Sequence, residues 1–366
     1  DPYGCIIDVD ASDFENGIVV GTGPYVVKEL VTDDHLTLTP NTQYWNGTPK
    51  IDELTIRTLS NGDTLSAALQ AGDIDAAYGM AYEAYPNFEN GGYQFSAIQT
   101  SRAFFGSMNM TSPIIQDAAV RKAIAMGINK EGFVKTLLDG HGVAANGAFP
   151  DGFSTFGGEN VTAEAYDPEG AKAVLEEAGW VDSDGDGIRE KDGVKASTTF
   201  LYSAGDDVRQ TIAMAVSNQI LENLGIEMVV EGVSWDELPA RMYSEPLVLA
   251  WGSSDPKTSY KLYHSSNAGK DDWYNPENFT SKTVDGYLDA ALSAKSLEEA
   301  IPFWQKAQWD GETGTSMRGE CPYIFVLNKT HVYWAREGLD TGVQKIHAHG
   351  DAWPLVQNIA EWTWTK

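Results

Sequence analysis

A run of aspartates between residues 182 and 193, DSDGDGIREKDG, is the stretch of this sequence that best matches a metal site. Asp182, Asp184 and Asp186 alternate with small residues, as in the first half of a helix-loop-helix calcium loop. Such a loop needs a bidentate glutamate at its twelfth position, which here is Gly193. The run also lies between a predicted helix and a predicted strand. We therefore predict a structural turn in preference to a calcium site.

The sequence offers little else that could perform catalysis. It contains no GxSxG, HExxH or GxxxxGK[ST] motif. His347 and His349 are two positions apart and would share a strand face, and we interpret them as exposed side chains. Eleven tryptophans in an acidic chain resemble carbohydrate-active enzymes in composition. A hydrolase therefore remains an alternative, although no pair of carboxylates can be placed at a defined spacing.

Composition limits the partners of this protein. The 366 residues include 25 Lys and Arg against 53 Asp and Glu, a formal charge of -28. Such a field repels nucleic acid and anionic membranes and favours a cationic ligand, so we expect no nucleic-acid partner. No apolar run approaches the length of a membrane span. Cys5 and Cys321 either form one disulfide or are two separate thiols, and the sequence leaves both possibilities open.

The first part of the chain predicts a small antiparallel unit followed by a helix. Residues 18–59 alternate apolar and polar side chains between turn sequences, which is typical of strands. The next segment predicts a helix that is capped by Asp63 or Thr64 and ends at Gly72. A short strand is expected over residues 74–78.

From about residue 107 the pattern becomes helical and then alternates with strands. A helix is predicted to begin at Asn129, and another is capped by Asp167 with Pro168 in its first turn. A strand, a long helix and a second strand follow over residues 197–233, which predicts a parallel crossover and an α/β fold. Residues 322–335 return to strand character.

Several stretches in order resemble the solute-binding proteins of ABC importers, in the peptide and nickel group. They span nearly the whole chain, and the aspartate run belongs to one of them. The matching stretches are GTGPYVVKEL (21–30), NTQYWNGTPKIDELTIRTL (41–59), LQAGDIDAAYG (69–79), SRAFFGSMNMTSPIIQDAAVRKAIAMGINKEGFV (101–134), YDPEGAKAVLEEAGWVDSDGDGIREKDG (166–193), WGSSDP (251–256) and PYIFVLNK (322–329).

The resemblance implies a bilobed, periplasmic-binding-protein-like α/β fold of type II, with two lobes joined by crossing hinge strands. Residues 1–106 would form part of the first lobe, 107–326 the second, and 327–366 would return to the first. The hinge would cross at Phe104–Asn109 and at Tyr323–Asn328. We expect a monomer that is not an enzyme, located outside the cytoplasm, in the periplasm or as a lipoprotein, and that delivers its ligand to an ABC permease.

The sequence departs from the family at its start. Members usually carry a sizeable segment before the point that matches GTGPY, and only about twenty residues precede that point here. We interpret the chain as lacking an N-terminal segment. The assignment of both cysteines to the region of the first lobe makes a bridge between Cys5 and Cys321 geometrically possible.

The residues immediately after Trp251 suggest the class of ligand. Peptide-binding members place an aspartate shortly after this tryptophan to pair with the peptide amino terminus. Here Asp255 matches a later, structural Asp-Pro pair, and Ser254 takes the place of the anchoring acid. The shortened loop is more similar to nickel-type members, which offer a histidine near the position of His264. A lone surface histidine is the competing interpretation.

Three further residues or groups are candidates for ligand contact. Trp251 could form a wall of the cleft or pack at the end of its strand. Arg102 could hold a carboxylate of a chelator or form a structural ion pair. An aromatic group could line the pocket or pack a long loop; it consists of Tyr260, Tyr263, Trp273 and Tyr274. The favoured ligand is nickel or another metal chelate carried as cargo, with no cofactor; a di- or oligopeptide is the alternative.

Overall fold

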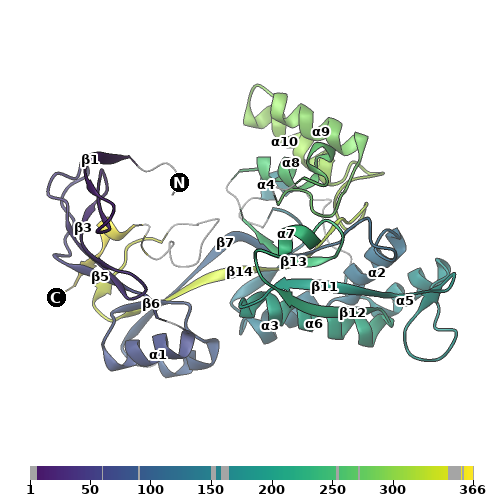
Figure 1. Ribbon diagram of the computed structural model, residues 1–366, viewed down its shortest axis with the longest axis horizontal. Helices are drawn as coiled ribbons and strands as arrows, with labels where there is room; N and C mark the ends of the chain where they lie inside the picture. The colour runs from purple at the N-terminus through teal and green to yellow at the C-terminus, as the bar shows by residue number, and fades with distance from the viewer. Residues whose placement is uncertain are drawn as a thin grey trace. The chain divides into compact units, whose positions relative to one another are not determined.

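The computed structural model describes residues 6–59, 61–89, 91–149, 154–157, 165–252, 255–270, 273–344, 356 and 358–365. The chain divides into two compact units (Figure 1). Unit 1 comprises Asp1–Ile98 and His331–Lys366, and unit 2 comprises Gln99–Thr330. Two long strands, β7 (Tyr93–Ser107) and β14 (Tyr323–Arg336), each run from one unit into the other. The boundaries expected from the sequence, after residues 106 and 326, fall within these same strands.

Unit 1 begins with short antiparallel strands. β1 (Ile7–Asp13) pairs with β2 (Ile18–Gly21). A separate sheet contains β3 (Tyr25–Val31), β4 (His35–Pro40) and β5 (Leu54–Arg57), again antiparallel. The antiparallel unit predicted from the alternation of side chains is confirmed.

The helix of unit 1, α1 (Gly62–Ala71), begins earlier than predicted. Its N-cap is Asn61, whose side chain accepts the backbone N–H of Thr64 at 2.9 Å. The cap expected at Asp63 or Thr64 is therefore wrong. The predicted end is confirmed, because Gly72 adopts the left-handed conformation with φ 81°.

The rest of unit 1 packs around the unit 1 part of β14. β6 (Ala76–Tyr78) pairs with β14, and Leu69, Phe88 and Trp334 belong to one buried cluster. The remaining elements of this unit are η1 (Tyr82–Asn87), β15 (Leu339–Asp340), η4 (Ile359–Glu361) and β16 (Thr363–Trp364).

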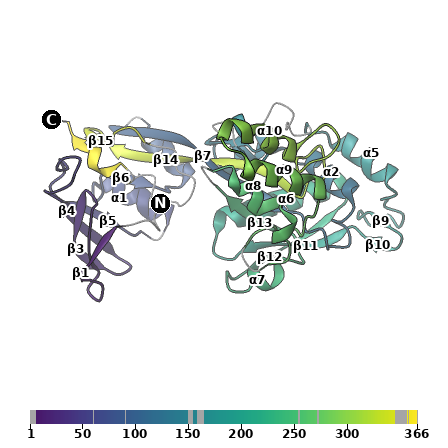
Figure 2. The ribbon, with the colours of Figure 1, turned by 90° about the horizontal axis from the view of Figure 1, so that it is seen from above.

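Unit 2 contains an α/β sheet in the order β12, β11, β13, β7, β14. β11 (Ser197–Ser203) and β12 (Glu227–Val233) run parallel and are joined by α6 (Asp207–Leu224), so the predicted crossover is confirmed (Figure 2). β13 (Leu247–Trp251) is parallel to β11 and antiparallel to β7. β8 (Gly142–Ala144) pairs with β14.

Helices cover both faces of this sheet (Figure 1). α6 lies on one face together with α2 (Ala118–Gly127), α3 (Lys130–Leu137) and α5 (Pro168–Glu177). The other face carries α8 (Lys257–Tyr263), α9 (Lys282–Ser293) and α10 (Leu297–Gln308), whose apolar residues share one buried cluster with those of β7, β11, β13 and β14. The remaining elements are α4 (Ser154–Gly157), β9 (Glu190–Lys191), β10 (Val194–Lys195), α7 (Leu238–Arg241) and η3 (Ser265–Asn267).

The two predicted hinge segments lie side by side. The ring of Phe105 contacts that of Tyr323 with centroids 4.8 Å apart, and the backbone N–H of Met108 donates to the carbonyl of Pro322 at 2.9 Å. Cys321 is a free, fully buried thiol beside them, and Cys5 lies outside the described residues. Burial raises the pKa of the Cys321 thiol to about 11.

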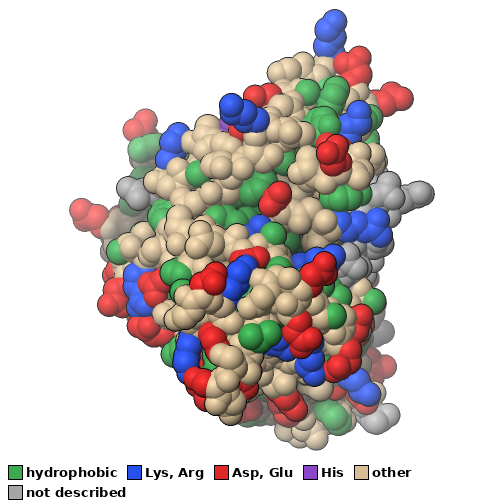
Figure 3. All heavy atoms as spheres, turned by 90° about the vertical axis from the view of Figure 1, so that its right-hand side faces the viewer, with side chains coloured by type: hydrophobic (Ala, Val, Ile, Leu, Met, Phe, Trp, Pro, Cys, Tyr) green, Lys and Arg blue, Asp and Glu red, His purple; other side chains and the backbone are tan. Residues whose placement is uncertain are grey.

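The surface and the helices agree with the composition. Acidic and basic side chains are interspersed over the coloured part of the face drawn in Figure 3, without a continuous basic area that a phosphate backbone would need. Of the helices that the structure describes, none has both the length and the apolar character needed to cross a bilayer.

Candidate ligand-binding site

The residues expected to contact ligand meet at one edge of the unit 2 sheet. β11, β12 and β13 all end at this edge, and open α/β sheets commonly bind ligands at the carboxyl ends of their strands. Trp251 is the last residue of β13 and lies opposite Ala103 of β7, which places Arg102 beside it in the neighbouring strand. The structure therefore brings Arg102 and Trp251 to the same edge, with their side chains on opposite faces of the sheet.

Arg102 lies against an aromatic ring instead of a carboxylate. Its guanidinium carbon is 5.8 Å from the ring centroid of Phe104. Its Nε is buried and has no hydrogen-bond partner among the described residues. Arg102 also forms no salt bridge with any described residue, so the alternative of a structural ion pair is not seen there. A half-buried guanidinium with an unused donor is suited to receiving a carboxylate from a ligand.

A second arginine, which the sequence did not identify as a site residue, lies on the same phenylalanine. The guanidinium carbon of Arg209 is 5.9 Å from the centroid of Phe104 and 5.2 Å from that of Trp235. Arg209 is buried and pairs with Asp206 at the start of α6. Trp235 follows the end of β12. The position of both residues just after predicted strands was the available signal.

Trp251 contacts another aromatic ring and also borders a small cavity. Its ring is 6.0 Å from that of Tyr274, over which Lys261 lies at 5.0 Å. On its inner side is a small, mainly apolar cavity of about 10 Å³, room for at most one water molecule. That cavity is lined by Ala103, Phe105, Ala148, Phe149, Trp251, Gly252, Asp255, Thr258, Leu262 and Phe325. Within unit 2, the indole thus both packs against the core and contributes an aromatic surface.

His264 is held by its own surroundings. Its Nδ1 accepts the backbone N–H of Ser266 at 3.1 Å, so the proton of the neutral ring is on Nε2, which lies 3.4 Å from the carboxylate of Asp289. Tyr260 stacks on the imidazole with centroids 4.3 Å apart. Nδ1 is engaged locally, whereas Nε2 is buried without a hydrogen-bond partner among the described residues. The Nδ1 bond and the ring stacking favour a structural role for His264 and Tyr260.

The remaining predicted site residues are either in structural positions or outside the described residues. Tyr263 is buried, and its ring contacts Tyr323 and Phe279 in the core, so it does not belong to an exposed aromatic surface. Asp255 accepts the backbone N–H of Lys257, the first residue of α8, at 2.8 Å, which suits a structural Asp-Pro pair. Ser254, His347 and His349 lie outside the described residues.

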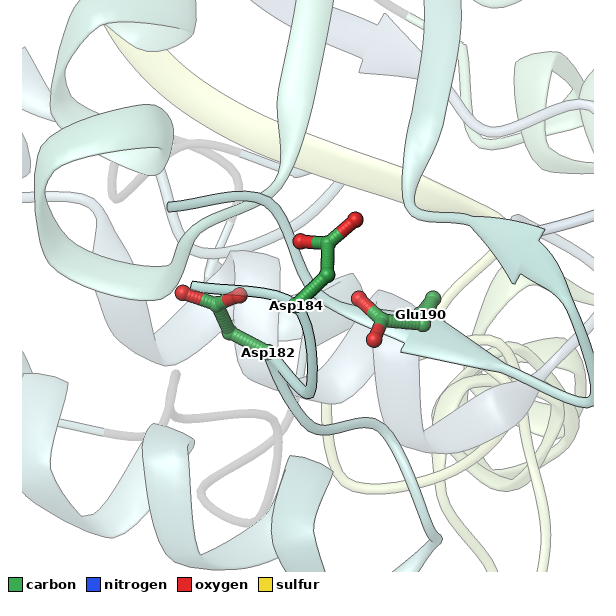
Figure 4. A group of neighbouring side chains, drawn as sticks. All are labelled: Asp182, Asp184 and Glu190. Carbon is green, nitrogen blue, oxygen red and sulfur yellow. The ribbon is translucent and has the colours of Figure 1, made fainter. Parts of the chain in front are cut away.

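The aspartate run forms consecutive turns held by its own side chains (Figure 4). Asp182 accepts the backbone N–H groups of Gly185 at 2.7 Å and Gly187 at 3.0 Å. Asp186 accepts the N–H of Ile188 and pairs with Lys195. These bonds support the turn interpretation.

One group of acidic side chains nevertheless lies close together in this loop. Asp182, Asp184 and Glu190 each place a carboxylate oxygen within 4.8 Å of the others, the one such group of three found in the described residues (Figure 4). Lys195 lies 3.6 Å from Asp184, and Ser183 donates to Glu190. Lys195 therefore already offsets part of the negative charge of this group, and Ser183 already occupies lone pairs of Glu190.

Unit 1 has a larger cavity, of about 420 Å³, between β5, β6 and the C-terminal segment. Its lining combines apolar residues such as Ile56, Ile74 and Trp362 with charged side chains such as Glu53 and Arg57. It contains none of the residues that the sequence suggested for ligand binding.

Comparison with known proteins agrees with this architecture. Residues 6–283 match the model of bacterial extracellular solute-binding proteins, family 5 Middle. The oligopeptide-binding protein AppA of Bacillus subtilis is 31% identical over 273 residues, 72% of this chain and 50% of that protein. The nickel-binding periplasmic protein of Escherichia coli is 26% identical over 233 residues, 62% of this chain and 44% of that protein.

A solved structure shares the fold. NikZ from Campylobacter jejuni, in complex with Ni(L-His), superposes with a TM-score of 0.77 at 21% identity, over 97% of this chain and 70% of that one. The chain spans about half the length of the two sequence relatives. These relatives are named as binding proteins and not as enzymes, which argues against the hydrolase alternative. The chain belongs to the bacterial extracellular solute-binding proteins of family 5.

Proposed function

We propose that this protein captures a small carboxylate-bearing solute outside the cytoplasm and delivers it to an ABC permease, and that the favoured solute is nickel or another metal held by a small organic chelator. The observation that carries the proposal is Arg102. Its guanidinium has a buried, unused Nε donor, and the residue lies at the carboxyl edge of the sheet, next in the strand to the partner of Trp251 and with its side chain on the opposite face. A chelator offers such a donor the carboxylate that it lacks.

The residues at this edge favour a chelated over a bare metal ion. The histidine expected nearby, His264, uses Nδ1 to accept the backbone N–H of Ser266, and its Nε2 is buried 3.4 Å from the carboxylate of Asp289. A metal that arrives with its own ligands needs only to be enclosed and oriented, which arginine and aromatic side chains can do. The nickel-binding relative of Escherichia coli supports this class of solute.

A di- or oligopeptide is the second candidate, supported by the similarity to the oligopeptide-binding protein AppA. A peptide requires a carboxylate for its ammonium group. Asp255, the acid nearest Trp251 in sequence, already accepts the backbone N–H of Lys257 at the start of α8. A peptide ligand would therefore need its anchoring acid elsewhere in the protein.

Calorimetry on the full-length protein tests the proposal. Titrations use Ni(II) alone, Ni(II) with L-histidine, and a panel of dipeptides. We expect Ni(II) with L-histidine to bind, and Arg102→Gln to weaken binding by roughly tenfold, the loss of one charge-assisted hydrogen bond. Arg336→Gln, which removes an exposed ion pair with Asp75 in unit 1, is the matched control and should change affinity less than twofold.

A further inference from the structure

A short loop beside the candidate site, Trp273–Phe279, has an unusual backbone. Three of its non-glycine residues have left-handed φ angles: Trp273 at 60°, Asn275 at 46° and Asn278 at 57°. Asparagine tolerates this conformation because its short side chain bonds locally. A tryptophan does not, and persists there only when its surroundings hold it. The position of Trp273 therefore requires an explanation.

The loop is fixed immediately after the tryptophan. Asn275 is fully buried, donates from Nδ2 to the carbonyls of His264 at 3.1 Å and Phe279 at 2.8 Å, and accepts the backbone N–H of Phe279 at 2.8 Å. The backbone N–H of Met110 donates to the carbonyl of Glu277 at 2.7 Å. These bonds fix the loop backbone beyond Trp273 and thereby direct the indole.

The indole of Trp273 is directed at a second indole. Its centroid lies 5.6 Å from that of Trp235, with the two ring planes at 59°. Trp235 is 48% exposed, and Trp273 packs on one side against the unit 2 core cluster but is only partly buried, so the pair keeps exposed surface. The guanidinium of Arg209 lies over the ring of Trp235 and also over that of Phe104, at the edge of the sheet. A strained backbone thus maintains a partly open aromatic surface beside the candidate site.

We propose that Trp273 is a specificity-determining residue, whose indole, positioned against Trp235, receives the face of a flat unsaturated ring of the solute. This inference rests on the proposed function and narrows its substrate class to carboxylate-bearing solutes that also contain such a ring. The imidazole of a histidine chelate has this form, as does the side chain of an aromatic residue in a peptide. Offset contact between flat rings favours them over saturated groups of similar size.

Two probe pairs test the ring requirement in the full-length protein by calorimetry. Ni(II) with L-histidine is compared with Ni(II) with L-2,4-diaminobutyrate, which has a carboxylate and amines but no ring. Ala-Phe is compared with Ala-Leu. We expect the ring-bearing member of at least one pair to bind roughly tenfold more tightly, and Trp273→Gly to abolish that preference.

Thermal melting of the same variants separates specificity from structure. Glycine relieves a left-handed backbone, but Trp273→Gly also removes the packing of the indole against the unit 2 core, so Tm is expected to stay unchanged or fall modestly while affinity for the ring-bearing probe falls. A tryptophan with a structural role alone would give a lower Tm with unchanged affinity. Asp192→Gly is the matched control, because Asp192 has φ 55° in an exposed turn outside the site. It should not alter affinity.

The outcomes distinguish the two proposals. Equal affinity for the ring-bearing and ring-free members of both pairs would overturn the role of Trp273 and leave solute capture standing. An unchanged ring preference in Trp273→Gly would do the same. If none of the four probes binds, the proposed ligand classes fail, and the ring requirement fails with them.

Discussion

Asp206 binds Arg209 twice, since its carboxylate accepts the backbone N–H of Arg209 at 2.9 Å and also pairs with the guanidinium of the same residue. The first contact caps α6, and the second neutralises a charge that is almost completely buried against Phe104 and Trp235. One side chain thus orders the start of a helix and part of the edge at which we place the ligand.

Asp206→Ala should therefore be costly. Loss of the cap removes about 1 kcal/mol, and loss of the ion partner of a buried guanidinium adds more, so the free energy of unfolding should fall by about 2–4 kcal/mol. Denaturant unfolding measures this change. Asp207→Ala removes the next, exposed acid of the same turn and should cost less than about 1 kcal/mol. Equal effects of the two substitutions would contradict the double role of Asp206.

Local signals explain the parts of the fold that the sequence predicted. The caps at Asn129 and Asp167 are made by side chains three residues from the amides they bind. α1 differs because its first residue is a glycine, which rarely favours a helix. A Cβ at Gly62 would lie 2.5 Å from the backbone nitrogen of Ala81, so the residue is required by tertiary contact, which no local pattern reveals.

The candidate site residues also divide into those that the sequence indicates and those that depend on tertiary contacts. Arg102 and Trp251 were proposed from the chemistry of their side chains and from stretches that resemble the family, and the sheet register places both at one edge. Arg209 and Trp235 were missed because they meet only where the ends of two different segments converge at Phe104. The left-handed backbone of Trp273 could not be predicted either, since tryptophan has no preference for that conformation.

Glu277 makes the stability of the protein depend on pH. Its side chain is fully buried, and burial raises the pKa of its carboxyl well above the ordinary value of 4.5. The folded protein keeps a proton that the unfolded chain releases, so stability should fall as pH rises from about 4.5 toward the raised pKa. Glu277→Gln should remove this slope and raise Tm at pH 7 by roughly 3 °C or more.

Melting curves between pH 4 and 8 measure the effect of Glu277→Gln. Near pH 4.5 the variant and the parent protein should differ little, and the gap should widen with pH. Glu222→Gln, at an exposed position of α6, serves as the control and should leave the slope unchanged. A constant difference in Tm across the whole range would show that packing, and not ionisation, distinguishes glutamate from glutamine at residue 277.

His264 provides a direct test of a structural against a ligand-binding histidine. Because Nδ1 receives the N–H of Ser266 and the ring stacks on Tyr260, His264→Ala should lower the free energy of unfolding by about 1–2 kcal/mol. His264→Asn restores an acceptor and should recover part of that loss. Neither variant should change the affinity for Ni(II) with L-histidine more than twofold. A tenfold loss in both would instead assign His264 to the metal.

The aspartate loop should hold its shape without calcium. Asp182 already accepts two backbone N–H groups, and Lys195 supplies a positive charge beside Asp184 and Asp186. A calcium ion would have to displace this lysine and redirect Asp182, and the loop offers glycine where a bidentate ligand is needed. We expect 100 µM calcium to change Tm by less than about 1 °C, the limit for a site that stays almost empty.

Asp182→Ala should lower the free energy of unfolding by about 1–2 kcal/mol with or without calcium, because it leaves two backbone amides without their acceptor. Asp184→Ala, which loses a single such bond to Asp186, should cost less. A calcium-dependent rise in Tm that disappears in Asp184→Ala would instead establish an ion site formed by Asp182, Asp184 and Glu190.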